Sequence, residues 1–590
     1  MPTTKTDSTT WDFSRLFKNP TPAAIKAELA RVKRESDKFV KKWEKRKDYL
    51  EKSKVLRQAL DEYNEWSETT GTSGKAGYYV WLRSNQDLND AAIKALQNQI
   101  RDVASALSNK LQFFTLRLGK ISPAKQKEFL KSKELLLYRH FLARLFAEAK
   151  HDLSEAEEKI MTLKAPLGYD NWHTMLEGFL SKETHEGKTL MEWTSHLSSP
   201  ERSVRHQAGT VLEGMFAKNA SVAEHELNAI LQNKKINDEL RGFARPDSSR
   251  HLAEDVDTKV VDTLISTVAS RFAIPKRYYA LKAKLLGLAD FNYYDRNAQL
   301  PGVEKKYPLA QAKEIIGRSL AQLDPEFAEI FNRFFAEGLV DVYPYPNKRG
   351  GAFCAYELKS LPTYILLNHQ DRLRDVTTLA HEVGHGINDE LMKQAQPGVY
   401  FGTPMATAEV ASTFMEDFAL AEITKDLTEE EQLNSNLTKL DDDMATIFRQ
   451  IACYRCEFEL HQTFRQKGYL SQDEISQIFK KHMASYLGAA AEKSDLWWVY
   501  WSHLRYYFYV YSYASGLLIS KALQAKVKKD PTFIKEVKTF LSAGLSDSPK
   551  NLFAKMGLDI TKKSFWDRGL DEVEQLLDDT EALAKKLGKT

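Results

Sequence analysis

The sequence predicts a mainly α-helical protein with one small β-sheet. Long stretches place apolar residues at helical spacing among charged ones, and only one region alternates β-prone runs with Gly, Pro and Asn. The 590 residues are 43% hydrophobic and 28% charged, which is typical of globular proteins. We therefore expect a large packed core, divided into several domains or built as one helical enzyme around a single cleft.

The first helical region runs from about residue 22 to residue 119. Text such as "AAIKAELARVKRESDKFVKKWEKRKDYLEK" predicts long amphipathic helices whose charges face solvent. Helical text continues to about Leu197, where "SSPERSVRHQA" predicts a new helix with a serine cap and a proline at its first position. We place a domain boundary there, between an N-terminal helical lobe (1–197) and a second region (198–590).

The predicted sheet lies in residues 340–371, "VDVYPYPNKRGGAFCAYELKSLPTYILLNHQD". Two β-prone runs, Ala352–Leu358 and Thr363–Asn368, are separated by turn-forming residues. From Arg372 onward the pattern is helical again.

Composition excludes several classes of function. The net charge of +3, from 84 basic and 81 acidic residues, gives no reason to expect binding to nucleic acid or to an anionic membrane. The most apolar run, 507–519, is shorter than the ~18 residues of a membrane span and predicts a buried helix. The N-terminus lacks the apolar core of a secretory signal, and three cysteines are too few for a disulfide framework. We expect a cytoplasmic monomer.

The stretch "TTLAHEVGHGIN" carries the strongest chemical signal. His381 and His385 are four residues apart, so on a helix they point the same way and both imidazoles can reach one zinc ion. Glu382 lies about 100° around the helix, beside the ion, where it suits a base acting on water at the metal. Gly384 leaves room for a close neighbour over the metal.

Chance accounts poorly for this motif. With 14 histidines in 590 residues, roughly 0.02 matches to the HExxH pattern are expected at random. The alternative, an ordinary helix that happens to carry two histidines, is therefore disfavoured.

A tetrahedral zinc needs one more protein ligand besides the two histidines and a water. The next helical stretch, "MATAEVASTFMEDFALAE", offers Glu409 early and Glu416 on the same face seven residues later. We predict Glu409 as the third ligand, against the alternative of a plain surface glutamate. Glu416 or Ser412 would then orient a ligand from behind.

The motif and its surroundings resemble the M3 family of zinc metallopeptidases, in its oligoendopeptidase F branch. The resemblance rests on HEVGH followed 24 residues later by the glutamate of "AEVASTFMED", and on "TTWDFSRLF", "ELRGFARPDSS", "YPYPNKRGGAFCAY" and "HLRYYFYVYSYASG". It covers nearly the whole chain. It implies two largely helical lobes that enclose a deep channel, with 198–590 as the catalytic region, one zinc per chain and oligopeptide substrates.

The segment "WWVYWSHLRYYFYVYSYASG" holds further candidates. On a helix His503, Tyr506 and Tyr513 would share one face, which by itself indicates an aromatic core helix. The resemblance instead implies a histidine and tyrosines that donate hydrogen bonds to the substrate carbonyl as it becomes an oxyanion. His503, Tyr506 and Tyr513 are the candidates, with Tyr507 or Tyr509 as alternatives to Tyr506.

Cys453 and Cys456 form a C-x-x-C with His461 nearby. This spacing can mark a redox pair or a second zinc site. The apolar positions around it, Ile447, Ile451, Tyr454 and Phe458, recur at helical spacing, which favours simple packing on an amphipathic helix.

These observations predict a zinc endopeptidase that cleaves short unstructured peptides with Glu382 as general base. We expect the strand Thr363–Asn368 to be a sheet edge onto which an extended substrate adds. A dipeptide-releasing exopeptidase of the same family is the main alternative. A module that captures peptides without cleaving them, with a structural zinc, is a weaker one.

Overall fold

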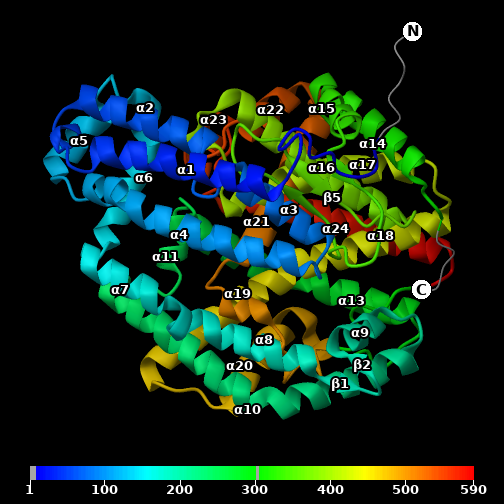
Figure 1. Ribbon diagram of the computed structural model, residues 1–590. Helices are drawn as coiled ribbons and strands as arrows, with labels where there is room; N and C mark the ends of the chain where they lie inside the picture. The colour runs from blue at the N-terminus through cyan, green and yellow to red at the C-terminus, as the bar shows by residue number, and fades with distance from the viewer. Residues whose placement is uncertain (1–7, 301–304) are drawn as a thin grey trace, which may run out of the picture.

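The computed structural model describes residues 8–300 and 305–590, and in that part of the chain the predicted mainly α-helical class is confirmed (Figure 1). Residues 1–7, part of the segment on which the absence of a secretory signal was argued, lie outside the described residues. No helix of the described ranges combines the length and apolar character that crossing a membrane requires.

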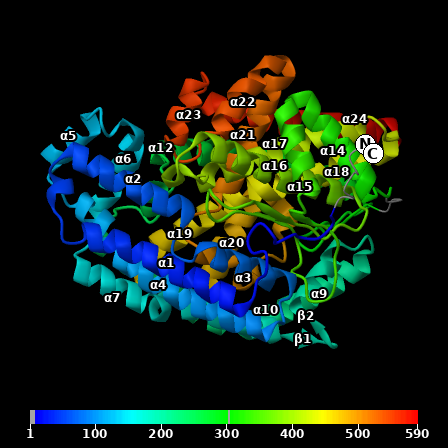
Figure 2. The same cartoon turned by 45° about the horizontal axis from the view of Figure 1, so that its top comes forward.

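Most of the N-terminal helices lie on the left of both ribbon views, and the last of them, at residues 190–195, lies at the lower right (Figures 1 and 2). Several begin where the sequence supplies a cap: Thr21 before Pro22, Asp90 before Ala91, and Ser122 before Pro123. The helices are α1 Pro22–Trp43, α2 Ser53–Thr69, α3 Gly74–Gln86, α4 Ala91–Gly119, α5 Pro123–Lys131, α6 Arg139–Glu148, α7 Glu155–Ala165, α8 Asn171–Lys182 and α9 Leu190–Ser195.

A 40-residue helix, α10 Arg202–Arg241, runs along the lower edge of the molecule in Figure 1. The predicted serine cap with a proline at the first helical position is wrong, because Glu201 is the N-cap residue and Pro200 precedes the helix. Ser199 instead turns the chain before the helix, where its hydroxyl accepts a hydrogen bond from the backbone N–H of Glu201 at 3.2 Å. The helix ends at Gly242, which adopts the left-handed conformation.

The remaining helices follow α10 along the chain and lie above it in the view of Figure 1. They are α11 Ser248–Ala253, α12 Thr258–Ser270, α13 Ala273–Leu285, α14 Leu309–Leu323, α15 Pro325–Ala336, α16 Leu373–Ala395, α17 Met405–Thr424, α18 Glu429–Asp443, α19 Gln450–Lys467, α20 Gln472–Leu487, α21 Tyr511–Lys529, α22 Ile534–Leu541, α23 Pro549–Lys555 and α24 Lys563–Lys586. The predicted buried helix corresponds to α21, but it begins only at Tyr511.

The predicted small sheet is present, with shorter strands than expected and one more of them. Its order is β3-β5-β4, with β3 Val340–Asp341 parallel and β4 Phe353–Ala355 antiparallel to β5 Tyr364–Leu366. The expectation that 363–368 forms the sheet edge is therefore wrong: β5 is central, because β3 pairs with the side that would otherwise be free. The edges are β3 and β4. A two-stranded hairpin, β1 Thr184–His185 with β2 Lys188–Thr189, was not predicted.

Buried apolar side chains form a large core and a smaller one. The smaller core belongs to the N-terminal helices and includes Phe39, Trp43 and Phe114. The larger core extends from Trp11 to Ala584 and also contains side chains from the first 197 residues. The domain boundary at residue 197 stays a prediction, because the larger core contains side chains from both sides of that position.

Helices α16, α17, α21 and α24 pack against one another in that order, and glycines allow their close approach. A Cβ atom at Gly384 of α16 would lie 2.7 Å from the carbonyl oxygen of Ala411 in α17. A Cβ at Gly516 of α21 would lie 2.7 Å from Cβ of Glu409 in α17, and one at Gly569 of α24 would lie 2.7 Å from the carbonyl oxygen of Leu518. The backbones therefore meet at distances that no larger residue permits, as predicted for Gly384.

We predict that Gly384→Ala destabilises the protein, because the added methyl group must push α17 away. Overpacking of this kind costs about 1–3 kcal/mol. Gly214→Ala is the matched control: Gly214 lies in α10 with open space where its Cβ would be, so alanine should raise stability by roughly 0.5–1 kcal/mol through its helix propensity. Chemical denaturation measures both. Equal effects of the two substitutions would contradict the close approach.

Candidate metal centre

The two histidines of the HEVGH motif stand on consecutive turns of α16. Their ring centroids are 5.1 Å apart with the ring planes at 81°. Both rings face α17, which crosses α16 at Gly384. The (i, i+4) spacing on a helix accounts for this arrangement.

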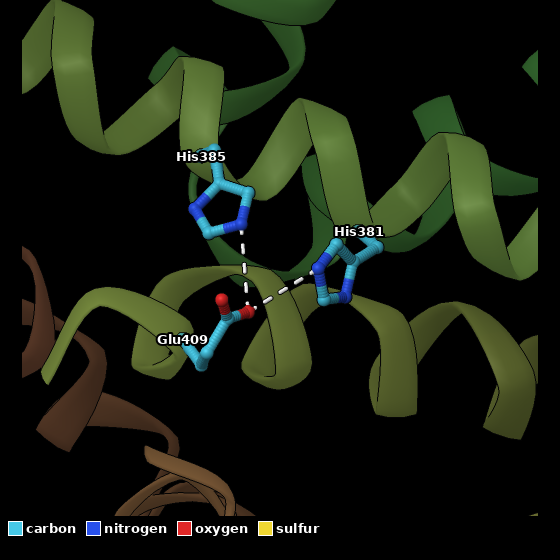
Figure 3. A group of neighbouring side chains, drawn as sticks. All are labelled: His381, His385 and Glu409. Carbon is cyan, nitrogen blue, oxygen red and sulfur yellow. Dashed lines mark ion pairs between the residues drawn. The ribbon is translucent and has the colours of Figure 1, made fainter. Parts of the chain in front are cut away.

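Glu409 reaches the two histidines from α17 (Figure 3). Its Oε2 atom lies 3.3 Å from Nε2 of His381 and 3.5 Å from Nε2 of His385. One possible ligand atom from each of the three side chains lies within 4.8 Å of the others. Among residues 8–300 and 305–590, these three side chains form the one group of His, Cys, Asp or Glu residues close enough to hold a metal ion. Two imidazole nitrogens and one carboxylate, with a fourth position open, are the donor set of a catalytic zinc site.

Two further side chains form hydrogen bonds with these candidate ligands. Glu416 accepts from Nδ1 of His381 at 3.1 Å, which leaves Nε2 facing Glu409. Ser412, fully buried, donates its hydroxyl to Oε2 of Glu409 at 3.0 Å. The sequence suggested one or the other as the orienting residue, and both contacts are present. Such partners fix the tautomer and orientation of metal ligands.

The electrostatics of the group suit a cation. Burial alone would lower the pKa of His381, but Glu409 and Glu416 raise it to about 10. Burial would also raise the pKa of Glu409, yet His381 and His385 hold it well below its usual range. The two carboxylates thus stabilise positive charge between the rings, which a bound metal ion would supply in place of protons.

Glu382 lies beside this group, as its position in the motif predicts. Its side chain is 7% exposed, and burial raises its pKa while His381 and His385 lower it. The backbone of Cys354, in the edge strand β4, also lowers the pKa of this carboxylate. The sheet edge therefore adjoins the carboxylate that would act on water.

A pocket of about 430 Å³ opens next to the metal group. Its wall joins the sheet to α16 and includes Ala352, Asn368, Arg374, His381, Glu382 and Asp442. Glu382 and His381 thus face a space large enough for a substrate group.

The aromatic segment does not form the predicted helix. Residues 502–505 make a short 3₁₀ turn, and Tyr507 and Phe508 adopt left-handed backbone angles with φ +52° and +61° before α21 begins at Tyr511. A face shared by His503, Tyr506 and Tyr513 through helical spacing therefore does not exist. Bulky residues seldom adopt this conformation, at a cost of order 1–3 kcal/mol each, so sequence alone did not indicate it.

Tyr509 takes the place beside His503 that was assigned to Tyr506. Its hydroxyl is hydrogen-bonded to Nδ1 of His503, and the Tyr513 ring lies 6.0 Å from the ring of His503 and 5.7 Å from that of Tyr509. The Tyr506 hydroxyl instead donates to Glu177 of α8 at 3.4 Å. From the sequence, Tyr509 was only an alternative to Tyr506 as an oxyanion donor.

One member of this aromatic group, Tyr513, lies on α21, the helix that packs against Glu409. Tyr513 is three residues before Gly516, whose backbone touches Glu409, and so lies on the same side of α21 one turn earlier. Burial lowers the pKa of His503 to about 4, so its ring is neutral at pH 7. Burial also raises the pKa of Tyr509, which keeps its proton. Because their mutual hydrogen bond uses one of the two protons, one of these neutral side chains at a time can donate to a third group.

Cys453 and Cys456 are buried in α19 as free thiols. Burial raises the pKa of each well above its usual value, which disfavours the thiolate that zinc or redox chemistry needs. Packing, the favoured interpretation, accounts for both.

Comparison with known proteins places this site in a family. Residues 195–572 match the model of peptidase family M3, and residues 117–177 match that of the oligopeptidase F N-terminal region. An oligoendopeptidase F homolog of Borreliella burgdorferi is 26% identical over 568 residues, covering 94% of each chain. The group B oligopeptidase PepB of Streptococcus agalactiae is 25% identical, covering 87% of this chain and 88% of that protein.

Solved structures agree on the fold. A crystal structure from Chlamydophila abortus has a TM-score of 0.83 at 23% identity and covers 97% of this chain and 98% of its own. That of oligoendopeptidase F from Enterococcus faecium has a TM-score of 0.66 at 19% identity, with coverages of 96% and 98%. The family model spans well over half of the chain and includes every residue of the metal group. The chain therefore belongs to peptidase family M3, in its oligoendopeptidase F type, and is a metallopeptidase.

Proposed function

We propose that the protein is a zinc-dependent endopeptidase that hydrolyses internal bonds of short, unstructured oligopeptides. The observation that carries this proposal is the meeting of His381, His385 and Glu409 across two helices, with Glu382 buried beside them. His381, His385 and Glu409 would hold one zinc ion per chain. When bound, zinc makes a water molecule acidic and polarises the carbonyl of the scissile bond.

The protein's own residues would then move the proton and hold the developing charge. Glu382 takes the proton from the attacking water and passes it to the leaving amine, and the backbone of Cys354 favours its charged form. Tyr513 and one member of the hydrogen-bonded His503–Tyr509 pair donate hydrogen bonds to the carbonyl oxygen as it becomes an oxyanion. Tyr506, whose hydroxyl turns toward Glu177, stays a candidate of lower rank in this scheme.

The substrate would lie along β4, the sheet edge next to Glu382. An extended peptide can add to such an edge through backbone hydrogen bonds, which makes binding tolerant of sequence. We further propose that the helical lobes enclose the site in a channel that admits oligopeptides and excludes folded proteins. Unfolding a globular protein costs about 5–15 kcal/mol, so its open population is very small. We expect the enzyme to act as a cytoplasmic monomer.

Release of dipeptides from the C-terminus is the second candidate function. It requires a cation that holds the terminal carboxylate near the metal. Arg374, which is exposed in the pocket beside His381, offers such a group.

We predict that His381→Ala, His385→Ala and Glu409→Ala each abolish zinc binding, whereas the wild type holds one zinc per chain that a chelator removes together with activity. Glu416→Gln should weaken zinc binding roughly 10–100-fold, because the partner that orients His381 is altered. Metal analysis after dialysis and chelator competition measure both effects. His225→Ala, an exposed histidine of α10, is the control. Full zinc occupancy in any of the three alanine variants would remove that residue from the ligand set.

We predict that Glu382→Gln keeps zinc and peptide affinity but loses nearly all turnover, since an amide cannot accept the proton. Zinc content, peptide binding by fluorescence anisotropy and steady-state rates test this. Glu390→Gln, on the same helix and away from the metal group, should keep the wild-type rate. A wild-type rate in Glu382→Gln would rule out the general-base role. Binding without turnover in the wild-type protein would instead support a peptide-capturing module.

We predict that blocking both termini of a good peptide leaves the cleavage site unchanged, as expected of an endopeptidase. Mass spectrometry of the products identifies the bond. The dipeptide-releasing alternative would be supported if amidation of the C-terminus removed most cleavage. Amidated peptides of other lengths should then also resist cleavage. In that case Arg374→Met should abolish the preference for a free carboxylate, because the guanidinium would no longer hold it.

A further inference from the structure

The turn between His503 and Tyr509 is unusual. Within the described residues, Tyr507 and Phe508 are the one pair of neighbouring non-glycine residues that both have positive φ. Two successive aromatic residues do not adopt this conformation unless their surroundings hold it, and such residues gather at functional sites. The contacts that hold this turn therefore bear on the position of Tyr509.

One of these contacts comes from a buried carboxyl group on α19. Glu457 is 1% exposed, and its Oε1 atom accepts a hydrogen bond from the backbone N–H of Phe508 at 2.9 Å. Its Oε2 atom has no hydrogen-bond partner among the described residues, and Nε2 of His461 lies 4.0 Å from Oε1. Among the described residues, the bond from the Phe508 N–H is therefore the one hydrogen bond that the Glu457 side chain makes.

The other contact comes from α11, on the carbonyl side of the turn. Arg250 donates from Nε to the carbonyl oxygen of Tyr507 and from Nη2 to that of Tyr506, each at 2.9 Å. A guanidinium that donates to two consecutive carbonyls fixes both the position and the tilt of that backbone. Glu457 thus binds the backbone N–H of Phe508, and Arg250 binds the carbonyl oxygens of Tyr506 and Tyr507.

We propose that Glu457 and Arg250 are positioning residues that hold the left-handed turn at Tyr507 and Phe508 and thereby keep the Tyr509 hydroxyl against His503. The inference rests on the proposed function, in which the hydrogen-bonded His503–Tyr509 pair supplies one donor to the oxyanion. Glu457 and Arg250 do not touch the reacting atoms. They act through the turn, whose relaxation would withdraw the Tyr509 hydroxyl.

The chemistry of the Glu457 contact provides a discriminating pair of variants. The turn needs only a hydrogen-bond acceptor at this position, because the donor is a neutral backbone N–H. Glu457→Gln keeps a carbonyl oxygen of the same reach, whereas Glu457→Leu keeps the side-chain size and removes the acceptor. Burial raises the pKa of Glu457 to about 8, which fits a site that tolerates the loss of charge.

The test measures kcat and KM on an internally quenched peptide, together with zinc per chain and Tm. Glu457→Leu should lower kcat roughly 10–100-fold, as expected when a catalytic donor is misplaced, with zinc unchanged. Its KM should stay within about 3-fold, because the lost interaction serves the transition state. Glu457→Gln should restore most of the rate. Glu459→Leu is the matched control: it removes a carboxylate from the same helix that contacts Lys481 and His482 of α20 and not the turn, so it should leave kcat unchanged.

The inference is overturned if folded, zinc-loaded Glu457→Leu keeps kcat near the wild-type value, or if Glu457→Gln is as impaired as Glu457→Leu. Should Glu457→Leu fail to fold, Arg250→Met carries the test, since Arg250 is partly exposed. A lower kcat with unchanged KM in that variant supports the inference, and an unchanged kcat overturns it. Failure of the proposed function has a different signature: no turnover in the wild type, or a wild-type rate in Tyr509→Phe.

Discussion

The site depends on the contact between the backbones of α16 and α17 at Gly384. Two imidazoles on one helix and a carboxylate on another can meet one ion only if the helices lie close together, and Glu409 Oε2 is 3.3 Å and 3.5 Å from the two Nε2 atoms. A methyl group at Gly384 would lie 2.7 Å from the Ala411 carbonyl oxygen. The residue inside the HEVGH motif that carries no side chain is thus as important to the geometry as the two histidines.

The same principle extends the site to a third helix. Gly516 brings α21 against Glu409, and Tyr513 then lies one turn away from that contact. The metal ligands and Tyr513 therefore come from successive helices of one packed series, α16, α17 and α21. Before α21 begins, the chain leaves helical geometry, and hydrogen bonds from α11 and α19 hold it where Tyr509 meets His503. Packing positions the metal group, whereas buried polar contacts position the aromatic group.

This difference explains what could be predicted from the sequence. The arrangement of the histidines and Glu382 follows from helical periodicity, which is local and strong in the sequence. Glu409 follows from the need of a zinc ion for a third ligand on the next predicted helix. Tyr509 could not be assigned, because its partner choice depends on a turn held by residues such as Arg250, more than 250 positions away. The central place of β5 was missed because β3 is only two residues long and has no strand signal of its own. Contacts between distant segments override local preference in both cases.

The central claim, that two helices brought together at Gly384 form one nitrogen- and oxygen-ligated zinc site, can be tested by X-ray absorption at the zinc edge of the purified protein. The account predicts a first shell of nitrogen and oxygen atoms at about 2.0–2.1 Å, with the outer-shell pattern of two imidazoles and no sulfur. A sulfur shell at about 2.3 Å would place the metal on the thiolates instead and contradict the account.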